Sequence, residues 1–196
     1  MTAVTNFWAY LLRVDPKLIR FFLDFGTPRP GELRSARRDV NKRRISGIVV
    51  DDRLITRGAA LETCPHVAAL KERFVHGKTW EETGYIELFE SWYKRINKGK
   101  YADCSWDDFK AHRLLDWDDV FQDIREHEYR PAKRPVDNVE VAISDKGEIL
   151  AVDGRHRLYF AQILGIQSIP IIVNLIAASM VERAQSVTEL EKILSR

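Results

Sequence analysis

The last third of the chain has the most regular spacing of apolar residues. Residues 139–144 alternate large apolar side chains with small or polar ones, which is the period of two of a half-buried strand. Asp145-Lys146-Gly147 has the composition of a tight turn, because Gly147 adopts positive φ without a steric penalty. Residues 148–152 then predict the returning strand, so this stretch indicates a β-hairpin.

A helix and a further strand are predicted directly after the hairpin. Asp153 is placed to cap a helix whose residues 158–164 are apolar around most of the circumference, which indicates a largely buried helix. Gly165 is the expected left-handed terminator, and residues 169–173 predict the next strand. A short helix over 188–194 is expected after it.

The first hundred residues predict mainly helices. Asp15 and Pro16 mark the start of one helix. Its apolar stripe spans residues 18–25, and Gly26 ends it. Around an Asp-Asp turn, residues 45–55 predict a small hairpin. Capping residues and glycines predict further helices from Pro65 to Gly77, from Thr79 (with Glu82) to Gly99, from Ser105 (with Asp108) and from Asp116 (with Asp119).

Together these patterns predict an α+β protein with two parts. Residues 1–104 are expected to form a mainly helical N-terminal region with a basic connector, and residues 105–196 a small mixed-sheet core. The length of 196 residues and the hydrophobic content of 45% suit one sizeable core with an extension. Trp80, Trp92, Trp106 and Trp117 have apolar neighbours, so we expect them to serve packing rather than base stacking.

The net charge of +2 is too small to indicate nucleic-acid binding by itself. One segment is nevertheless strongly basic, and Glu32 and Asp39 alone oppose its charge. It contains Arg29, Arg34, Arg37, Arg38, Lys42, Arg43 and Arg44. Such a cluster from Arg29 to Arg44 either neutralises several nucleic-acid phosphates or forms a solvated surface, and both interpretations stay open.

Cysteine usage and hydropathy indicate a soluble cytoplasmic protein. Cys64 and Cys104 have neither Cys-x-x-Cys nor His/Cys ligand spacing, so we expect no zinc site and no disulfide scaffold. A reducing cytoplasm is the simplest location. The apolar residues 7–14 are too few to cross a bilayer and no basic leader precedes them, so no membrane partner is expected.

The segment Asp153-Gly154-Arg155-His156-Arg157 is the strongest candidate for chemistry. A helix that opens at Gly154 directs unpaired N–H groups outward, and its dipole places roughly half a positive charge there, so an anion is favoured. The arginines suit phosphate because a guanidinium donates two parallel hydrogen bonds, and glycine lets the backbone approach a ligand closely. The alternative is that Asp153 is only a cap and the arginines are solvated.

From Asp116 to Val173 the chain resembles the ParB/sulfiredoxin superfamily. The residues that carry the resemblance are Trp117, Val120, Phe121 and Ile124, the loop 126–131, the strand 139–143, the hairpin, Asp153 to Leu158, Gly165-Ile166 and Ile169-Pro170-Ile171. At the motif, partition proteins have Gly-Glu-Arg-Arg, sulfiredoxins Gly-Cys-His-Arg and archaeal free serine kinases Asp-Gly-His-His-Arg, which is the most similar. The resemblance implies a ParB/sulfiredoxin-like fold and a nucleoside di- or triphosphate bound by Gly154, Arg155, His156 and Arg157.

Two departures from these relatives narrow the prediction. Sulfiredoxin chemistry needs a nucleophilic thiolate before the His-Arg pair, and this chain has Arg155 there. Partition proteins carry a helix-turn-helix domain after the nucleotide-binding fold, whereas about twenty residues follow Val173 here. We therefore expect neither sulfinic acid reduction nor DNA reading of the partition type.

The leading hypothesis is a kinase-like transfer of phosphate from ATP, ADP or CTP to a small hydroxylated acceptor. In such reactions the protein mainly positions phosphates and neutralises charge. Asp153 is expected to organise the site, either by holding Mg²⁺ through water or by orienting the acceptor; the alternative is that it only caps the helix. His156 of the motif, Asp108 and His112 complete the predicted catalytic set. Asp108 and His112 are included because the serine kinases have their general base a little before the helix that corresponds to residues 117–124. Asp107 lies in the same neighbourhood, and Asp108 also has a capping role.

Two other functions remain as alternatives. One is a nucleotide-binding switch without turnover, associated with nucleic acid through the basic segment from Arg29 to Arg44. The other is a ParB-like nuclease, for which the sequence lacks the cluster of acidic ligands that two-metal cleavage needs.

Overall fold

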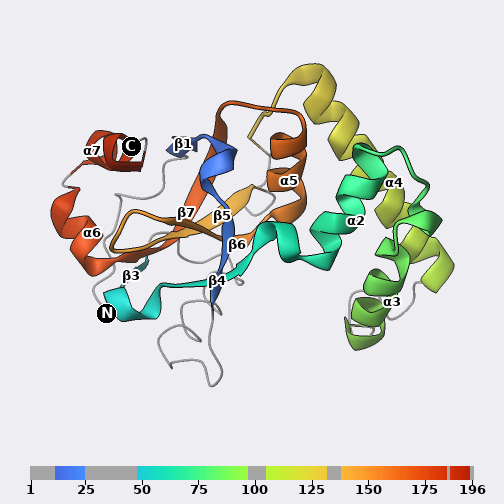
Figure 1. Ribbon diagram of the computed structural model, residues 1–196, viewed down its shortest axis with the longest axis horizontal. Helices are drawn as coiled ribbons and strands as arrows, with labels where there is room; N and C mark the ends of the chain where they lie inside the picture. Colours follow the sequence, from blue (N-terminus) through green and yellow to red (C-terminus); the bar gives the residue numbers. More distant parts are fainter. Residues whose placement is uncertain (1–11, 25–47, 97–104, 132–137, 185, 195–196) are drawn as a thin grey trace.

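The computed structural model describes residues 12–24, 48–96, 105–131, 138–184 and 186–194 (Figure 1). The described strands form one seven-stranded mixed sheet in the order β1-β7-β5-β6-β2-β4, with β3 also paired to β7. The strands are β1 (Leu12–Val14), β2 (Phe21–Asp24), β3 (Ile48–Val50), β4 (Thr56–Ala60), β5 (Val139–Ile143), β6 (Ile149–Asp153) and β7 (Ile169–Ala177). Together with the helices, this sheet confirms the predicted α+β class.

The predicted hairpin, helix and strand of the last third are confirmed. Strands β5 and β6 pair antiparallel around the 145–147 turn, where Gly147 has a φ of 82°. Helix α5 (Arg155–Ile163) follows, Gly165 has a φ of 66°, and β7 then pairs parallel with β5. All five residues of β5 are buried, so this strand is covered on both faces and is not half-buried as its alternation suggested.

The prediction of a mainly helical N-terminal region is wrong for the described residues between 12 and 60. Asp15 caps only the short 3₁₀ turn η1 (Pro16–Leu18), accepting a hydrogen bond from the Lys17 N–H at 2.9 Å. Strand β2 follows and pairs parallel with β6. Aromatic residues suit strands, and the free edge of β6 supplies the partner that overrides the helix-like spacing.

The predicted hairpin over residues 45–55 is also wrong where the structure describes it. Strand β3 is followed by the 3₁₀ turn η2 (Asp52–Leu54) and then by β4. The two strands take different partners, because β3 pairs with β7 and β4 pairs with β2. Asp51 accepts a hydrogen bond from the Arg53 N–H at 3.0 Å, so it caps a turn that separates the two strands.

The other helices are α2 (Pro65–Phe74), α3 (Tyr85–Ile96), α4 (Trp106–His127), α6 (Ala178–Arg183) and α7 (Val187–Leu194). The capping box of Thr79 and Glu82 is present, but it opens the 3₁₀ turn η4 (Trp80–Glu82), and α3 begins after Gly84. Ser105 caps α4 as predicted. The predicted helix start at Asp116 is wrong, because α4 continues through it and keeps one apolar stripe with buried Phe109, Leu114 and Phe121.

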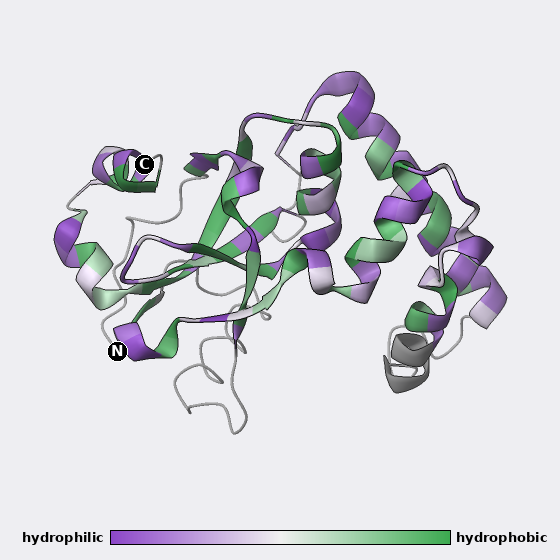
Figure 2. Cartoon of the chain, in the orientation of Figure 1, coloured by the Kyte–Doolittle hydropathy of each residue, from purple (hydrophilic) through white to green (hydrophobic). Residues whose placement is uncertain are grey.

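Helix α5 lies between the sheet and the other helices of its side. It packs against α2 and α4, whereas α6 contacts β7 and α7 contacts β1 at the other end of the sheet (Figure 1). Hydrophobic residues dominate the central strands, and polar and apolar residues alternate along α4 (Figure 2). Trp80 is buried and Trp106 and Trp117 pack against the core, as predicted, while the Trp92 side chain lies outside the described residues. The start of α5 is thus held by the sheet below and two helices beside it.

Candidate anion-binding site

Gly154 forms the junction between β6 and α5. It is the N-cap residue of α5 with a φ of 78°, and as a glycine it offers no side chain to cap the helix. A Cβ at this position would lie 2.7 Å from the Asn138 carbonyl oxygen and 2.8 Å from the Val139 Cα. Close packing against the start of β5 therefore requires a glycine here, and the close approach of a ligand stays a prediction.

Asp153 is not the N-cap that was predicted. Its side chain is exposed, and its Oδ1 accepts a hydrogen bond from the Gly154 N–H at 2.7 Å, one residue before the helix begins. This carboxylate binds the N-cap residue's own N–H, and among the described residues no side chain accepts from the first-turn N–H groups of α5. The start of α5 therefore keeps the donors and the partial positive charge that favour an anion.

His156 points toward the helical side of the protein. Its ring stacks on Trp117 with centroids 4.0 Å apart and planes at 16°, and its Nε2 lies 2.7 Å from the Tyr85 hydroxyl oxygen. Burial lowers the pKa of His156 well below its ordinary value, and the positive charge of Arg155 lowers it further. Burial raises the pKa of Tyr85, so the protonated hydroxyl donates and the neutral imidazole accepts. His156 thus joins α5 to α3 and α4, and as a neutral imidazole it adds no positive charge to the motif.

Arg157 is bound to the segment that follows α4. Its Nε donates to the Tyr129 hydroxyl at 3.3 Å, its Nη2 donates to the Arg130 carbonyl at 3.1 Å, and its guanidinium lies 5.0 Å from the Tyr129 ring centroid. Tyr129 is buried, and burial raises its pKa against the opposing effect of Arg157. Two donors of this arginine are therefore used within the protein.

Arg155 differs from its two neighbours in the motif. Within the described part of the chain its side chain forms neither a hydrogen bond nor an ion pair, and it is half-buried. Its charge reaches the surrounding groups, because it lowers the pKa of both His66 and His156. Arg155 is consequently the arginine of this motif whose guanidinium is available for a ligand.

Two groups from other helices lie within the electrostatic reach of the motif, and only one of them carries a charge. His66 lies in the first turn of α2 and contacts the Tyr85 ring edge-on at 5.8 Å. Burial, followed by repulsion from Arg155, lowers its pKa to about 4. Arg113 lies one helical turn before Trp117 and also depresses the pKa of His156. Arg155 and Arg113 therefore supply the positive charge near the start of α5, whereas the two histidines are neutral.

The hydrogen-bond donors of Arg113 are only partly used. Its Nη1 lies 3.7 Å from the Asp116 carboxylate, a long contact, and its guanidinium lies 5.5 Å from the Trp117 ring. Among the described residues its Nε is buried with no hydrogen-bond partner. The Trp117 Nε1 is also buried without a well-formed hydrogen bond. It nevertheless lies close enough to the Tyr85 hydroxyl to lower the pKa of Tyr85, against the effect of burial. Arg113 therefore has unused hydrogen-bonding capacity close to the motif.

The structure does not bring the predicted general bases to the motif. Asp108 is exposed, accepts a hydrogen bond from the Ser105 hydroxyl at 2.7 Å and belongs to the cap of α4. It precedes Trp117 by nine residues, or about 13 Å along a helix. His112 is exposed on another face of α4 than Trp117, and Asp107 pairs with Lys110. Only Asp153 of the predicted carboxylates lies beside the start of α5.

Asp153 was also the predicted metal ligand. The described residues contain no group of three or more His, Cys, Asp or Glu side chains arranged to hold a metal ion. Magnesium commonly takes one or two carboxylates and completes its shell with phosphate oxygens and water, so the donor set of Asp153 and a nucleotide phosphate fits this ion. The role of Asp153 toward Mg²⁺ stays a prediction.

Several predicted features lie outside the described residues or away from the motif. The basic segment from Arg29 to Arg44 and Cys104 are outside the described residues, and Cys64 is a free thiol at the start of α2. Two surface cavities, of about 370 and 620 Å³, are lined by other residues than 153–157. The candidate site is therefore the N-terminus of α5 and the side chains around it. Its positive charge and hydrogen-bond donors, rather than a cavity, distinguish it.

Comparison with known proteins found no family model, no curated protein and no solved structure that matches this chain. The resemblance to the ParB/sulfiredoxin superfamily therefore stays a prediction. Among the described helices, none combines the length and the apolar composition needed to cross a membrane.

Sequence reasoning missed the residues that support the motif from a distance. No pattern in the sequence gives Tyr85, His66, Arg113 or Tyr129 a role at the motif. Tyr85 lies 71 residues from its partner His156, and Tyr129 lies 28 residues from Arg157. No local pattern joins such residues, so only the packing of α2, α3 and α4 against α5 could show them.

Proposed function

We propose that this protein binds the phosphate groups of a nucleoside di- or triphosphate at the first turn of α5. One observation carries the proposal: Arg155 is half-buried at an uncapped helix start and forms no hydrogen bond or ion pair with a described residue. A half-buried cation beside a positive helix end is unfavourable without an anion. A phosphate would accept from Arg155 and from the first-turn N–H groups, which is the most favourable arrangement for that charge.

Arg113 is the second expected phosphate contact. Arg113 belongs to α4, and its charge acts on His156 of α5. Its Nε is a buried donor without a partner among the described residues. Arginines from two elements would clamp a polyphosphate better than one, because each guanidinium donates parallel hydrogen bonds. Arg157 and His156 hold α5 in place through Tyr129 and Tyr85, and Asp153 would complete the shell of a phosphate-bound Mg²⁺.

A thermal shift assay with ATP, ADP and CTP, each with and without Mg²⁺, tests this proposal. A nucleotide at one hundred times its Kd stabilises the folded protein by about 2.7 kcal/mol, so the Tm should rise clearly. Arg155→Gln should remove the rise. Arg125→Gln changes an exposed arginine elsewhere on α4 and should keep it. An unchanged Tm with every nucleotide would contradict the proposal.

Phosphoryl transfer to a small hydroxylated acceptor is the catalytic form of this proposal. Asp153 is the carboxylate beside the start of α5, where it would orient the acceptor or hold the metal. Incubation with ATP, Mg²⁺ and a panel of small alcohols, followed by mass spectrometry, should then yield a phosphorylated product. Asp153→Asn should abolish product formation and leave nucleotide binding without Mg²⁺ intact.

A nucleotide-binding switch without turnover is the second candidate, and one observation favours it. Asp108 and His112 are exposed on α4 and have no described contact with the motif, so the predicted general bases are not assembled there. This candidate predicts nucleotide binding with no product, together with salt-sensitive DNA association that is lost when Arg37, Arg38, Arg43 and Arg44 are replaced.

A further inference from the structure

A cavity of about 620 Å³ is lined by residues of α2 and α5, two helices that pack side by side (Figure 1). The turn η3 (Leu61–Thr63) and the start of β2 contribute the rest of the lining. Ile19, Leu61 and Val67 line it and are buried, so part of its surface is apolar. Its volume falls within the range of about 300–1,000 Å³ that is typical of small-molecule sites.

Two side chains of α5 supply an aromatic ring and polar atoms to this cavity. Tyr159 and Gln162 line it, and both are half-buried. Burial raises the pKa of Tyr159, whose hydroxyl has no hydrogen-bond partner among the described residues. The Gln162 Nε2 donates to the Pro16 and Ile19 carbonyls at 2.8 and 3.1 Å, which fixes this side chain and leaves its Oε1 as an acceptor. A nucleobase needs such groups, because it stacks on aromatic rings and forms hydrogen bonds at its edges.

The cavity and the candidate anion-binding site share one face of α5. Arg155, Tyr159 and Gln162 are spaced by four and three residues, so they form one stripe along the helix. Tyr159 follows Arg155 by about one turn, a rise of about 6 Å. The charge of Arg155 also lowers the pKa of His66 in the first turn of α2, the other helix that lines the cavity. A ligand held by Arg155 would thus meet the cavity about one turn farther along α5.

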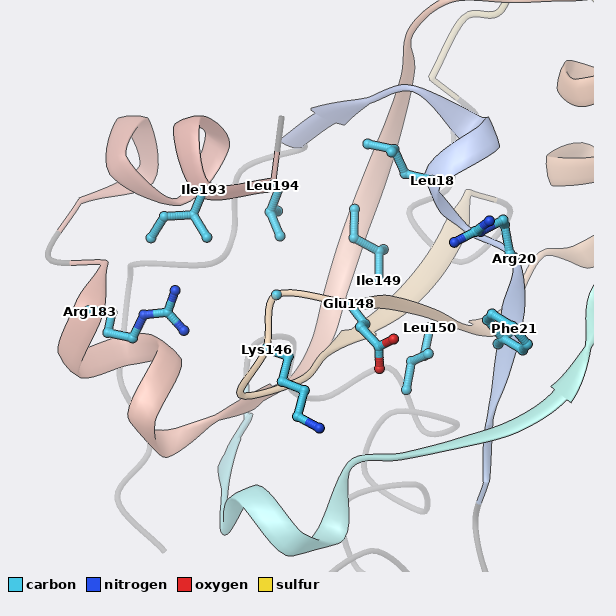
Figure 3. Close-up of a pocket in the computed structure, with 11 residues that line it drawn as sticks. Leu18, Arg20, Phe21, Lys146, Glu148, Ile149, Leu150, Arg183, Ile193 and Leu194 are labelled. Carbon is cyan, nitrogen blue, oxygen red and sulfur yellow. The ribbon is translucent and has the colours of Figure 1, made fainter. Parts of the chain in front are cut away.

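The smaller cavity, of about 370 Å³, has no such relation to the motif (Figure 3). Ile149, the first residue of β6, lines it, whereas the motif begins at Asp153, the last residue of that strand. Figure 3 shows its two arginines, Arg20 and Arg183, at opposite ends of the hollow. Its cations therefore do not converge on one ligand group. Of these two cavities, the larger one is lined by α5.

The charges around the larger cavity favour an uncharged occupant. Its charged residues are Arg20, Glu62 and Lys71, which are all exposed and carry both signs. The carboxylate of Glu62 repels a phosphate, but it accepts hydrogen bonds from hydroxyl groups such as those of a ribose. The cavity is thus suited to a neutral group with an aromatic part, and the charge of the same ligand would lie outside it, at Arg155.

We propose that this cavity binds the nucleoside part of the nucleotide whose phosphates lie at the start of α5, with the base against Tyr159 and Gln162. The inference rests on the proposed phosphate site and adds the part that recognises the base and the ribose. The protein should therefore distinguish a nucleotide from an inorganic polyphosphate, which a phosphate site alone does not do.

Isothermal titration of the full chain with ATP, CTP and inorganic triphosphate, all without Mg²⁺, tests this inference. At least one nucleotide should bind about tenfold more tightly than triphosphate, because it adds stacking and burial of the base. Triphosphate carries at least as much negative charge, so such a preference comes from the nucleoside. Triphosphate binding as tight as that of both nucleotides would overturn the inference and leave the phosphate site standing. Absence of binding by all three would overturn both.

Filling the cavity tests its role without removing a packed side chain. Ala68 is an exposed residue of α2 in the lining, and Ala68→Phe would occupy the space of the nucleoside. It should weaken nucleotide binding about tenfold or more and leave triphosphate binding unchanged. Ala111→Phe makes the same change at an exposed position of α4 and should bind both probes like the natural sequence. An unchanged nucleotide affinity in Ala68→Phe would refute the assignment of the cavity.

Tyr159 variants test the contact with the base. Tyr159→Ala should weaken nucleotide binding about tenfold, because the stacking surface is lost, and should keep triphosphate binding. Tyr159→Phe keeps the ring and should recover most of the lost affinity. Triphosphate binding and the Tm of each variant report whether the fold and the phosphate site are intact. Nucleotide binding by Tyr159→Ala equal to that of the natural sequence would exclude a base at this residue.

Discussion

The histidines around the start of α5 are neutral because their surroundings exclude charge. Burial is the main cause for both His66 and His156, and repulsion from Arg155 adds to it. His156 in addition accepts a hydrogen bond from Tyr85 that requires its unprotonated Nε2. Folding therefore prevents both imidazoles from taking up a proton that they bind readily in the unfolded chain.

We expect the free energy of unfolding to fall as the pH is lowered from 7 toward 4. The pKa of His66 drops from 6.5 to about 4 on folding, and that of His156 is lowered as well. Between the unfolded and folded pKa values of a histidine, the unfolded chain binds more protons than the folded chain. The free energy of unfolding therefore rises with pH in that range and decreases as the pH falls. Urea denaturation at pH 7, 6 and 5 measures the slope.

The histidine variants control this measurement. His66→Gln should make the slope shallower, because it removes one of the groups whose pKa is lowered on folding. His112→Gln replaces an exposed histidine of α4 and should keep the slope of the natural sequence. An identical slope in His66→Gln and the natural sequence would show that folding does not lower the pKa of His66.

The turn from β6 into α5 depends on a glycine with two separate constraints. Gly154 has a φ of 78°, and a Cβ there would lie within 3.0 Å of backbone atoms of Asn138 and Val139. Gly165, at the other end of the same helix, has a φ of 66° but nothing within 4 Å of its Cβ position. The two positions share the backbone conformation and differ only in the space around it.

We therefore expect Gly154→Ala to destabilise the protein more than Gly165→Ala. Alanine at Gly165 should lower the free energy of unfolding by about 1–2 kcal/mol, the cost of a left-handed backbone for a residue with a Cβ. Alanine at Gly154 should lower it by about 3 kcal/mol or more, because the clash with β5 is with backbone and cannot be relieved by a rotamer change. Chemical denaturation of both variants measures the difference. Equal losses would mean that β5 moves aside without penalty.

One sheet includes strands from both ends of the chain. Strand β2 pairs with β6, and β1 and β3 both pair with β7, so three of the strands before residue 104 contact those after it directly. Gln162 of α5 also donates to the Pro16 and Ile19 carbonyls at 2.8 and 3.1 Å. The part of the chain predicted as a separate core therefore uses the N-terminal strands to complete its sheet.

A fragment of residues 105–196 should consequently not fold by itself. It would keep only β5, β6 and β7, and the edges covered by β1, β2 and β3 would be exposed. We expect near-ultraviolet circular dichroism without fixed aromatic signals and urea unfolding without a cooperative transition. The full chain, measured in parallel, should show both features. Cooperative unfolding of the fragment would support the division at residue 104 instead.

The amino-acid sequence alone predicts the elements whose signals are local. The β5–β6 hairpin, α5 and the start of β7 follow from alternation, from turn residues such as Gly147 and from a glycine terminator, because each involves neighbours in the chain. The same reasoning locates the motif at a helix start, since the transition from strand to helix is visible in the residues themselves. It fails for residues 18–25, whose apolar spacing suits either a helix or a strand.

The tertiary structure decides the pairings and the availability of side chains. Strand β2 exists because β6 offers it an open edge, which no local pattern contains. In the motif, His156 and Arg157 contact Tyr85 and Tyr129, while Arg155 forms no polar contact with the described residues. Three adjacent basic residues are equivalent in sequence. They differ in the folded protein because successive helical residues point about 100° apart and meet different neighbours.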